Sequence, residues 1–312
     1  MRKSTVCILA ASLALAGFTA CNKKPDVTAA SDSDFSFEFT EVTTETSTVV
    51  TTTEEPTEPF KGYRMINVYL NGNLVSVQDY DENGNMVRDK HLGDEGFTYN
   101  YVFDESGNLI RETKLNVDGT IESQHVYEYD ESGRMTKKTF VVTEGVSGNS
   151  HVYGYDASGF LVLDTEYNPD GTVCQTIGYE NDAYGNPVKQ TQRDTNGEMF
   201  EIKNEYEYDS YGNISKWTVY RGGELNGWTE TAYDNKGHIT SEKVFLPDGT
   251  IKSWIEYEYN ENSDMTVQTI YKEDGTIFQI IMYGYDSNGL AIETKFDSNG
   301  DIVEMYQYVY TY

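Results

Sequence analysis

Basic residues, cysteines and long apolar runs are all scarce in this chain of 312 residues. It has 23 Lys and Arg against 52 Asp and Glu, which gives a formal charge of −29. Nucleic-acid binding depends on clustered Lys and Arg, so this balance argues against a nucleic-acid partner. There are three cysteines, Cys7, Cys21 and Cys174, which excludes a Cys-rich metal site. The apolar run at residues 6–16 is too short for a membrane-spanning helix of about 20 residues.

Aromatic residues and glycine, in contrast, are plentiful, with 26 Tyr, 13 Phe and 27 Gly. A solvated coil would hold far fewer aromatic residues, so general disorder is excluded. Gly among many Tyr, Thr and Val residues is typical of strands and turns rather than helices. The length allows one or two domains with a sizeable core.

Residues 1–20 are typical of an export signal, because Arg2 and Lys3 precede the short apolar run. The segment Phe18-Thr19-Ala20-Cys21 resembles the lipobox of bacterial lipoproteins, with Phe18 where Leu is usual. The resemblance implies that the signal is removed and that Cys21 carries a lipid. The chain would then be exported and anchored to a bacterial membrane, facing the cell exterior, or the periplasm in a Gram-negative cell. The alternative is an ordinary secretory signal that is cleaved after Ala20.

Residues 21–59 are expected to form the lipid anchor and a stalk. Residues 40–58 contain nine Thr and five Glu but no Lys or Arg. Such a segment has too little apolar surface to offset the entropy lost on ordering, so we predict a disordered, self-repelling stalk. Cys174, further along, replaces an apolar residue in a strand pattern, and we expect a buried, unreactive thiol there.

From residue 60 to residue 312 the chain repeats itself, mostly with a period of 26 residues. A first turn is written Asp130-Glu131-Ser132-Gly133-Arg134 in one clear copy, and its glycine recurs at residues 84, 107, 133, 159, 185, 212, 237 and 289, with Ser263 standing in once. A second turn, such as residues 117–120, lies midway in each period. Both turns mostly place Asp or Asn shortly before a Gly that can adopt a positive φ, which is typical of hairpins. Nineteen such turns predict about 20 strands.

The strands between these turns alternate in character. Tyr stands six and four residues before most first-turn glycines, often with Glu between them, so the tyrosines share one face and the Glu residues the other. Most of these tyrosines are expected to form the core as cross-strand aromatic pairs. The alternative is a ligand platform for a polysaccharide. The residues of this candidate binding platform are Tyr127, Tyr129, Tyr153, Tyr155, Tyr206, Tyr208, Tyr257 and Tyr259.

These patterns predict an all-β fold. A flat sheet of 20 strands would be about 95 Å wide, and open sheets of more than about ten strands curl because each strand is twisted against the next. We therefore predict an extended antiparallel meander of about 20 strands, two per repeat, curled into a spiral or open-barrel-like single sheet. The alternative is two stacked layers.

The sequence Tyr-x-Tyr-Asp-x-x-Gly-Arg-Met at residues 127–135 resembles the YD repeat of the rearrangement-hotspot (RHS) family. The resemblance covers about residues 62–312. Members of that family build long antiparallel meanders that curl into a spiral shell, and in large members the shell encloses a toxin or forms part of a cell-surface receptor. We recognise no aspartyl-protease-like segment in this chain and expect no toxin domain after Tyr312.

No segment carries a known catalytic motif: there is no nucleophile elbow, no zinc-binding His-Glu-x-x-His and no phosphate loop. Residue type alone leaves a glycosidase-like carboxylate pair open, but no pair stands out, and we expect neither enzyme activity nor a cofactor. The Asp-rich turns raise the question of calcium. Residues 130–133 are too short for the usual calcium loop and lack its distal Glu, so we expect the Asp to accept hydrogen bonds from its own turn instead of binding a metal.

Together these features predict a lipid-anchored bacterial surface protein that binds a glycan or a surface protein without catalysis. Its partners would be the membrane, through the lipid on Cys21, and a polysaccharide or surface protein. The alternative is a structural or protective shell, toxin-associated or immunity-like, that packs against a partner polypeptide. Solvent-facing tyrosines would favour the glycan, whereas protected tyrosines and an open sheet edge would favour strand pairing with a protein.

Overall fold

The computed structural model describes residue 62 and residues 64–312, except residues 94, 144 and 145. The predicted signal (1–20) and the predicted anchor and stalk (21–59), with Cys21, lie outside the described residues. In the part of the chain that is described, no helix is long and apolar enough to cross a membrane.

The described residues form twenty strands and no helix. The strands are β1 (Met65–Leu70), β2 (Asn73–Tyr80), β3 (Met86–His91), β4 (Phe97–Phe103), β5 (Leu109–Asn116), β6 (Ile121–Tyr129), β7 (Met135–Thr143), β8 (Val146–Tyr155), β9 (Leu161–Tyr167), β10 (Val173–Asn181), β11 (Pro187–Asp194), β12 (Met199–Tyr208), β13 (Ile214–Arg221), β14 (Glu224–Tyr233), β15 (Ile239–Phe245), β16 (Ile251–Tyr259), β17 (Met265–Tyr271), β18 (Ile277–Asp286), β19 (Gly289–Phe296) and β20 (Ile302–Thr311).

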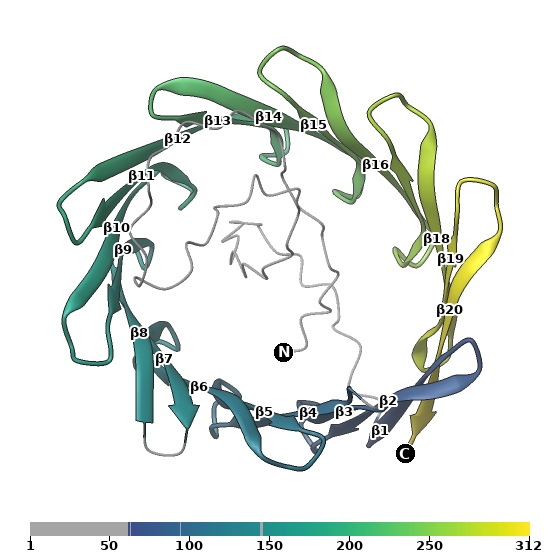
Figure 1. Ribbon diagram of the computed structural model, residues 1–312. Helices are drawn as coiled ribbons and strands as arrows, with labels where there is room; N and C mark the ends of the chain where they lie inside the picture. Colours follow the sequence, from purple (N-terminus) through teal and green to yellow (C-terminus); the bar gives the residue numbers. More distant parts are fainter. Residues whose placement is uncertain (1–61, 63, 94, 144–145) are drawn as a thin grey trace.

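Each strand pairs antiparallel with the next one in sequence, and the last pairs with the first. The closing seam joins β1 to β20 from Met65 opposite Thr311 to Leu70 opposite Tyr306. Ile66 and Val68 are buried there against tyrosines of β20. The result is a closed barrel (Figure 1). The prediction of a single curled antiparallel sheet of about 20 strands is confirmed, the alternative of two stacked layers is wrong, and no strand is left with an open edge among the described residues.

Most of the hairpin turns share one hydrogen-bonding pattern. In residues 130–134 the N–H of Gly133 donates to the carbonyl of Asp130, and the N–H of Asp130 donates to the carbonyl of Arg134. Gly133 has a φ of 77°, as the left-handed position of this turn requires. The Asp130 carboxylate accepts the N–H groups of Ser132 and Arg134 at 2.9 and 3.0 Å. The expectation that the Asp serves its own turn is confirmed.

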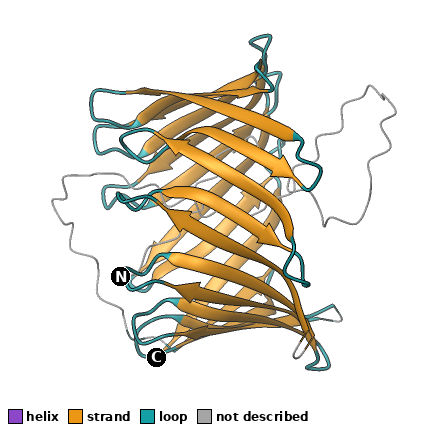
Figure 2. Ribbon diagram, turned by 90° about the vertical axis from the view of Figure 1, so that its left-hand side faces the viewer, coloured by secondary structure: helices purple, strands orange, loops and turns teal. Residues whose placement is uncertain are grey.

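Because strands alternate in direction, the two kinds of turn lie at opposite ends of the barrel (Figure 2). We call the end with the first turns the first rim; its turns are residues 81–85, 104–108, 130–134, 156–160, 182–186, 209–213, 234–238, 260–264 and 286–289. We call the other end the second rim; its turns are residues 71–72, 92–96, 116–120, 168–172, 194–198, 222–223, 246–250, 272–276 and 297–301, with the turn between β7 and β8. The chain enters β1 and leaves β20 at the first rim, where the N–H of Arg64 donates to the carbonyl of Thr311.

Side-chain exposure alternates along the strands. On β12, Ile202 and Asn204 are buried, whereas Lys203 between them is exposed. Side chains crowd together on the concave side of a closed sheet, so the buried set lines the inside of the ring. Residues directly opposite each other on paired strands lie on the same face of the sheet. Ile202 lies opposite Gln190, which lies opposite Tyr179, so all three side chains share the inner face. The tyrosines therefore belong to the inner wall.

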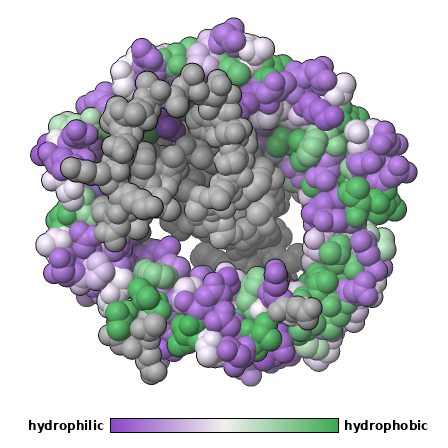
Figure 3. Space-filling view, in the orientation of Figure 1, coloured by the Kyte–Doolittle hydropathy of each residue, from purple (hydrophilic) through white to green (hydrophobic). Residues whose placement is uncertain are grey.

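A ring of this size is too wide for its own side chains to fill. Barrels of 16–18 strands already leave an aqueous channel, and this barrel has 20 strands. The packed part of the molecule is therefore the wall and not the centre. Seen along the barrel, hydrophobic and hydrophilic residues are mixed round the ring (Figure 3).

Candidate functional site

The eight tyrosines of the predicted platform lie on the inner wall, on β6, β8, β12 and β16. They are half-buried, except Tyr257, which is 6% exposed. Burial raises the pKa of the Tyr127 and Tyr153 hydroxyls well above the usual range for tyrosine. The structure thus brings the predicted residues into one wall, as the alternation implied, and places them where they also support the sheet.

Most tyrosines four residues before a first-turn glycine form a hydrogen bond that recurs round the first rim. The hydroxyl of Tyr129 donates to the carbonyl of Leu109, at the start of the neighbouring strand, at 2.8 Å. We call this contact the tyrosine latch, because it ties the end of one strand at the first rim to the start of the strand before it. The other latches join Tyr155 to Met135, Tyr233 to Ile214, Tyr259 to Ile239, Tyr285 to Met265 and Tyr310 to Leu290; the side-chain amide of Asn181 does the same to Leu161, and the hydroxyl of Tyr206 to Pro187.

Two further platform tyrosines use their hydroxyls on acidic side chains. Tyr208 donates to Asp182 at 2.6 Å, and Tyr257 donates to Glu242 at 2.7 Å. Glu242 is buried in the inner wall, and this burial raises the pKa of its carboxyl. Hydroxyl groups that donate hydrogen bonds within the sheet are typical of tyrosines that stabilise the barrel.

The inner wall also carries paired ionisable groups that the sequence did not single out. His151 lies 2.9 Å from Asp164, and this hydrogen bond raises the pKa of the imidazole. His125 lies 3.5 Å from Glu112, and a hydrogen bond to His125 lowers the pKa of the Glu112 carboxyl. Within the described residues, no group of three or more His, Cys, Asp or Glu side chains is placed to hold a metal ion.

Two exposed tyrosines lie at the tips of first-rim turns. Tyr184 is 55% exposed and Tyr211 is 81% exposed, and they occupy the same position in the turns 182–186 and 209–213. The ring of Tyr184 packs against that of Tyr208 at 5.2 Å, so the exposed tyrosine is continuous with a residue of the predicted platform. We call Tyr184 and Tyr211 the rim tyrosines.

Sequence reasoning missed the rim tyrosines, although a signal was present. The other seven first turns carry Asn, Ser or Lys at this position, as a solvated turn residue should. An aromatic residue at a site that is otherwise polar was the sign of an additional role. The turn aspartates beside them, Asp182 and Asp209, have a pKa below the usual range because they accept hydrogen bonds from their turns and neighbouring side chains.

Two tryptophans form a second aromatic group, on the outer wall, but their ring faces are covered. Trp254 stacks on Tyr271 at 4.2 Å, and the ammonium group of Lys243 lies 4.2 Å from its ring centroid. Lys243 and Tyr271 belong to the strands on either side of β16, so they cover opposite faces. Trp228 likewise stacks on Phe245 at 4.9 Å. Such rings offer edges rather than faces to a ligand.

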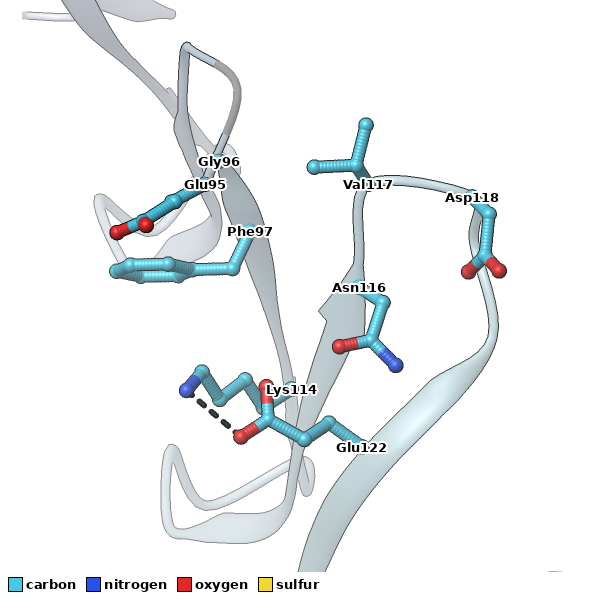
Figure 4. Close-up of a pocket in the computed structure, with 8 residues that line it drawn as sticks. All are labelled: Glu95, Gly96, Phe97, Lys114, Asn116, Val117, Asp118 and Glu122. Atoms are coloured by element: carbon cyan, nitrogen blue, oxygen red, sulfur yellow. Dashed lines mark hydrogen bonds and ion pairs between the residues drawn. The ribbon is translucent and has the colours of Figure 1, made fainter.

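A cleft of about 470 Å³ opens at the second rim, between the turns 92–96 and 116–120 (Figure 4). The Phe97 ring forms one wall, and the ammonium group of Lys114 lies 4.9 Å from its centroid. Lys114 is bonded to Glu122 at 3.0 Å, which leaves Glu95 and Asp118 as further carboxylates of the cleft. With one cationic and three anionic side chains, the cleft has a net negative charge.

Cys174 is 2% exposed in β10, so the prediction that it is buried is confirmed. It is disulfide-bonded, however, and the prediction of a thiol at this position is wrong. The spacing of cysteines along a sequence does not show which of them meet. The chain's other two cysteines, Cys7 and Cys21, lie outside the described residues.

No family model matches the sequence, and no curated protein matches it. Among solved structures the chain is similar to a crystal structure of TcdB2-TccC3, with 13% identity and a TM-score of 0.31 over 76% of this chain and 18% of that one. It is similar to a porin-like protein from Bacteroides uniformis, with 9% identity and a TM-score of 0.36 over 81% of this chain and 98% of that one. A Photorhabdus luminescens Tc holotoxin pore matches with 13% identity and a TM-score of 0.28, over 74% of this chain and 16% of that one. The chain thus spans less than a fifth of the toxin chains.

Proposed function

We propose that this chain is an exported, lipid-anchored bacterial surface protein whose YD-repeat barrel binds a glycan without catalysis. The lipobox-like segment before Cys21 supports the anchor, and the recurring motif of residues 127–135 supports the YD-repeat assignment. The barrel would stand clear of the membrane on the stalk of residues 21–59. The lipid on Cys21 would hold it to the cell exterior, or to the periplasmic side in a Gram-negative cell.

The observation that carries the glycan proposal is the pair of rim tyrosines. The apolar face of a tyrosine ring packs against the C–H face of a sugar, while its hydroxyl stays in water. Tyr184 and Tyr211 lie on successive first-rim turns, and two strands separate corresponding points by about 10 Å. The carboxylates of Asp182 and Asp209 lie in the same turns and accept hydrogen bonds there. The ligand we favour is a polysaccharide that spans both rings.

The test is retention of the full chain on columns of cell-wall and host polysaccharides. The double variant Tyr184→Ala, Tyr211→Ala is expected to lose about tenfold or more in affinity for the polymer that retains the wild type, because the two stacking faces are removed. Tyr312→Ala removes another exposed tyrosine at the first rim and serves as the matched control. Equal retention of the double variant and the control, or no retention of the wild type on any polymer, would overturn the glycan proposal.

A second candidate function is a shell that packs round a partner polypeptide. The closed ring of 20 strands with a polar and aromatic inner wall favours it, because such a ring encloses space that its own side chains do not fill. Strand addition to a sheet edge, in contrast, loses its support, since every described strand is paired on both sides. Failure on every polysaccharide, together with a polypeptide that copurifies with the chain from intact cells, would favour the shell.

A further inference from the structure

The two rims differ in the solvent exposure of the apolar residues in and beside their turns. At the first rim this residue, for example Leu109 or Met135, is half-buried, and its carbonyl accepts a tyrosine latch. Six apolar residues in and beside the second-rim turns are exposed, from 40% for Ile121 to 67% for Val117. We call them the apolar rim set: Val117, Ile121, Val146, Val173, Met199 and Ile302. A run of exposed apolar residues round one end of a molecule marks an interaction surface.

The second rim is also acidic. Its turn segments hold a single basic residue, Lys272, whereas carboxylates recur from turn to turn. Exposed examples are Glu95, Asp118, Asp170, Glu198, Asp248 and Asp274. Hydrogen bonds from Thr120 and Thr172 lower the pKa of Asp118 and Asp170 further below the usual range for Asp. Apolar side chains at this end are therefore interspersed with negative charge.

The cleft of Figure 4 lies in this rim and combines the two properties. Val117 borders it with an exposed apolar side chain, and the Phe97 ring forms its wall. Lys114 already pairs with Glu122, so the open carboxylates are those of Glu95 and Asp118. His91 stacks on the Phe97 ring at 4.3 Å from one neighbouring strand, and Lys114 lies 4.9 Å from its centroid from the other, so the ring faces are covered. The two carboxylates of the cleft suit a Lys or Arg side chain through ionic attraction.

We propose that the second rim docks a basic polypeptide that also presents apolar side chains, with one Lys or Arg side chain seated in the cleft. This rim is the end of the barrel at which the chain neither enters β1 nor leaves β20, so the described chain ends do not block it. Its acidic carboxylates supply attraction and orientation, and the apolar rim set supplies the contact area that water is excluded from. The proposal concerns the opposite end from the rim tyrosines and does not depend on glycan binding.

Other occupants fit the charge less well. A second copy of the chain would place one acidic rim against another, and like charges across an interface oppose association. An anionic lipid surface or a nucleic acid would be repelled for the same reason. A neutral glycan would gain nothing from the carboxylates of Glu95 and Asp118, whereas a basic side chain would.

The test measures binding of synthetic 20-residue peptides to the full chain by fluorescence anisotropy. The probes are an amphipathic Lys/Leu peptide, a Lys/Ser peptide of equal charge and a Glu/Leu peptide. The Lys/Leu peptide is expected to bind most tightly and the Glu/Leu peptide least. The many acidic residues of the chain attract any basic peptide, so the deciding measurement compares the affinities of two variants for the same peptide. The rim variant is Ile121→Thr, Val173→Thr, Met199→Thr, Ile302→Thr, and we expect it to bind the Lys/Leu peptide about tenfold more weakly than the wild type.

The matched control changes four exposed apolar residues of the outer wall: Val152→Thr, Leu163→Thr, Met282→Thr, Val309→Thr. It carries the same charge and a similar loss of apolar surface, and we expect wild-type affinity. Thermal unfolding of both variants establishes that each is folded, and glycan retention through the rim tyrosines should be unchanged in both. Equal affinity of the rim variant and the control, or equal affinity of the Lys/Leu and Lys/Ser peptides for the wild type, would show that the second rim is not the docking surface.

Discussion

At the scale of single residues, the tyrosines of this chain divide by what their hydroxyl groups do. Tyr129, Tyr155 and Tyr259 donate to backbone carbonyls of the neighbouring strand, and Tyr257 donates to a buried carboxylate. Tyr211, in contrast, stands in solvent at the tip of a turn. The same residue type therefore serves the wall in most copies and is available to a ligand in two of them. Position relative to the turn glycine separates the two groups.

The latch can be measured by removing one hydroxyl at a time. Tyr129→Phe keeps the ring but leaves the carbonyl of Leu109 without its hydroxyl donor, so we expect the free energy of unfolding to fall by about 1 kcal/mol. Tyr211→Phe, whose hydroxyl lies in an exposed side chain, should change it by less than about 0.5 kcal/mol. Urea unfolding followed by tyrosine fluorescence gives both values. Similar losses in the two variants would show that the latch does not stabilise the barrel.

At the scale of the element, the hairpin is the unit that repeats. Its turn needs a residue with positive φ, which glycine supplies in eight of the nine first-rim turns. The exception is Ser263, which adopts a φ of 70°. The turn keeps its form, because the N–H of Ser263 donates to the carbonyl of Asn260 and the Asn260 side chain accepts the N–H of Asp264. Hydrogen bonding thus holds a serine in a conformation that it rarely adopts.

A reciprocal pair of substitutions tests this strain. Ser263→Gly is expected to raise the free energy of unfolding by about 1 kcal/mol, because glycine adopts the left-handed region without a steric cost. Gly237→Ser, at the matching position, should lower it by a similar amount. A Cβ at Gly237 meets no atom within 4 Å, so its cost comes from the backbone alone. Differential scanning calorimetry measures both shifts, and a fall for Ser263→Gly would contradict the explanation.

At the scale of the whole molecule, closure decides what the sheet can do. Six paired positions join β1 to β20, and the apolar cluster of Ile66 and Val68 packs against tyrosines of the last strand. Closure removes the exposed edges that invite strand addition and aggregation. It also turns one face of every strand inward and creates two chemically different rims. Both proposed binding surfaces, the rim tyrosines and the apolar rim set, are consequences of that geometry.

The proposed lipid anchor on Cys21 is tested with the full chain expressed in bacteria. We expect mass spectrometry of the protein extracted from bacterial membranes to find a lipid on Cys21 and no residue before it. Cys21→Ser should release the protein into the soluble fraction. With Cys7 removed and Cys21 lipidated, Cys174 would have no disulfide partner within the mature chain, so an intramolecular disulfide at Cys174 in the protein from membranes would contradict the anchor.

The sequence by itself determined the strands, their number and the chemistry of the turns. Each hairpin is local: an Asp before a Gly, as in residues 130–133, specifies the turn, and the alternation of Tyr and Glu specifies the two faces. These interactions join residues close in the chain, so their pattern can be read along it. The number of hairpins then implied a sheet too wide to stay flat.

Only the tertiary structure decided the rest. Whether β1 would meet β20 depends on the twist and stagger accumulated over 20 strands, which no short segment encodes. The same closure decided that Tyr127 and Tyr257 line the inner wall, that Tyr184 and Tyr211 stand at the first rim, and that Phe97 and Asp118 border one cleft at the second. Contacts of this kind join residues from different hairpins. The sequence supplies all of these side chains, but closure of the barrel decides which of them lie next to each other.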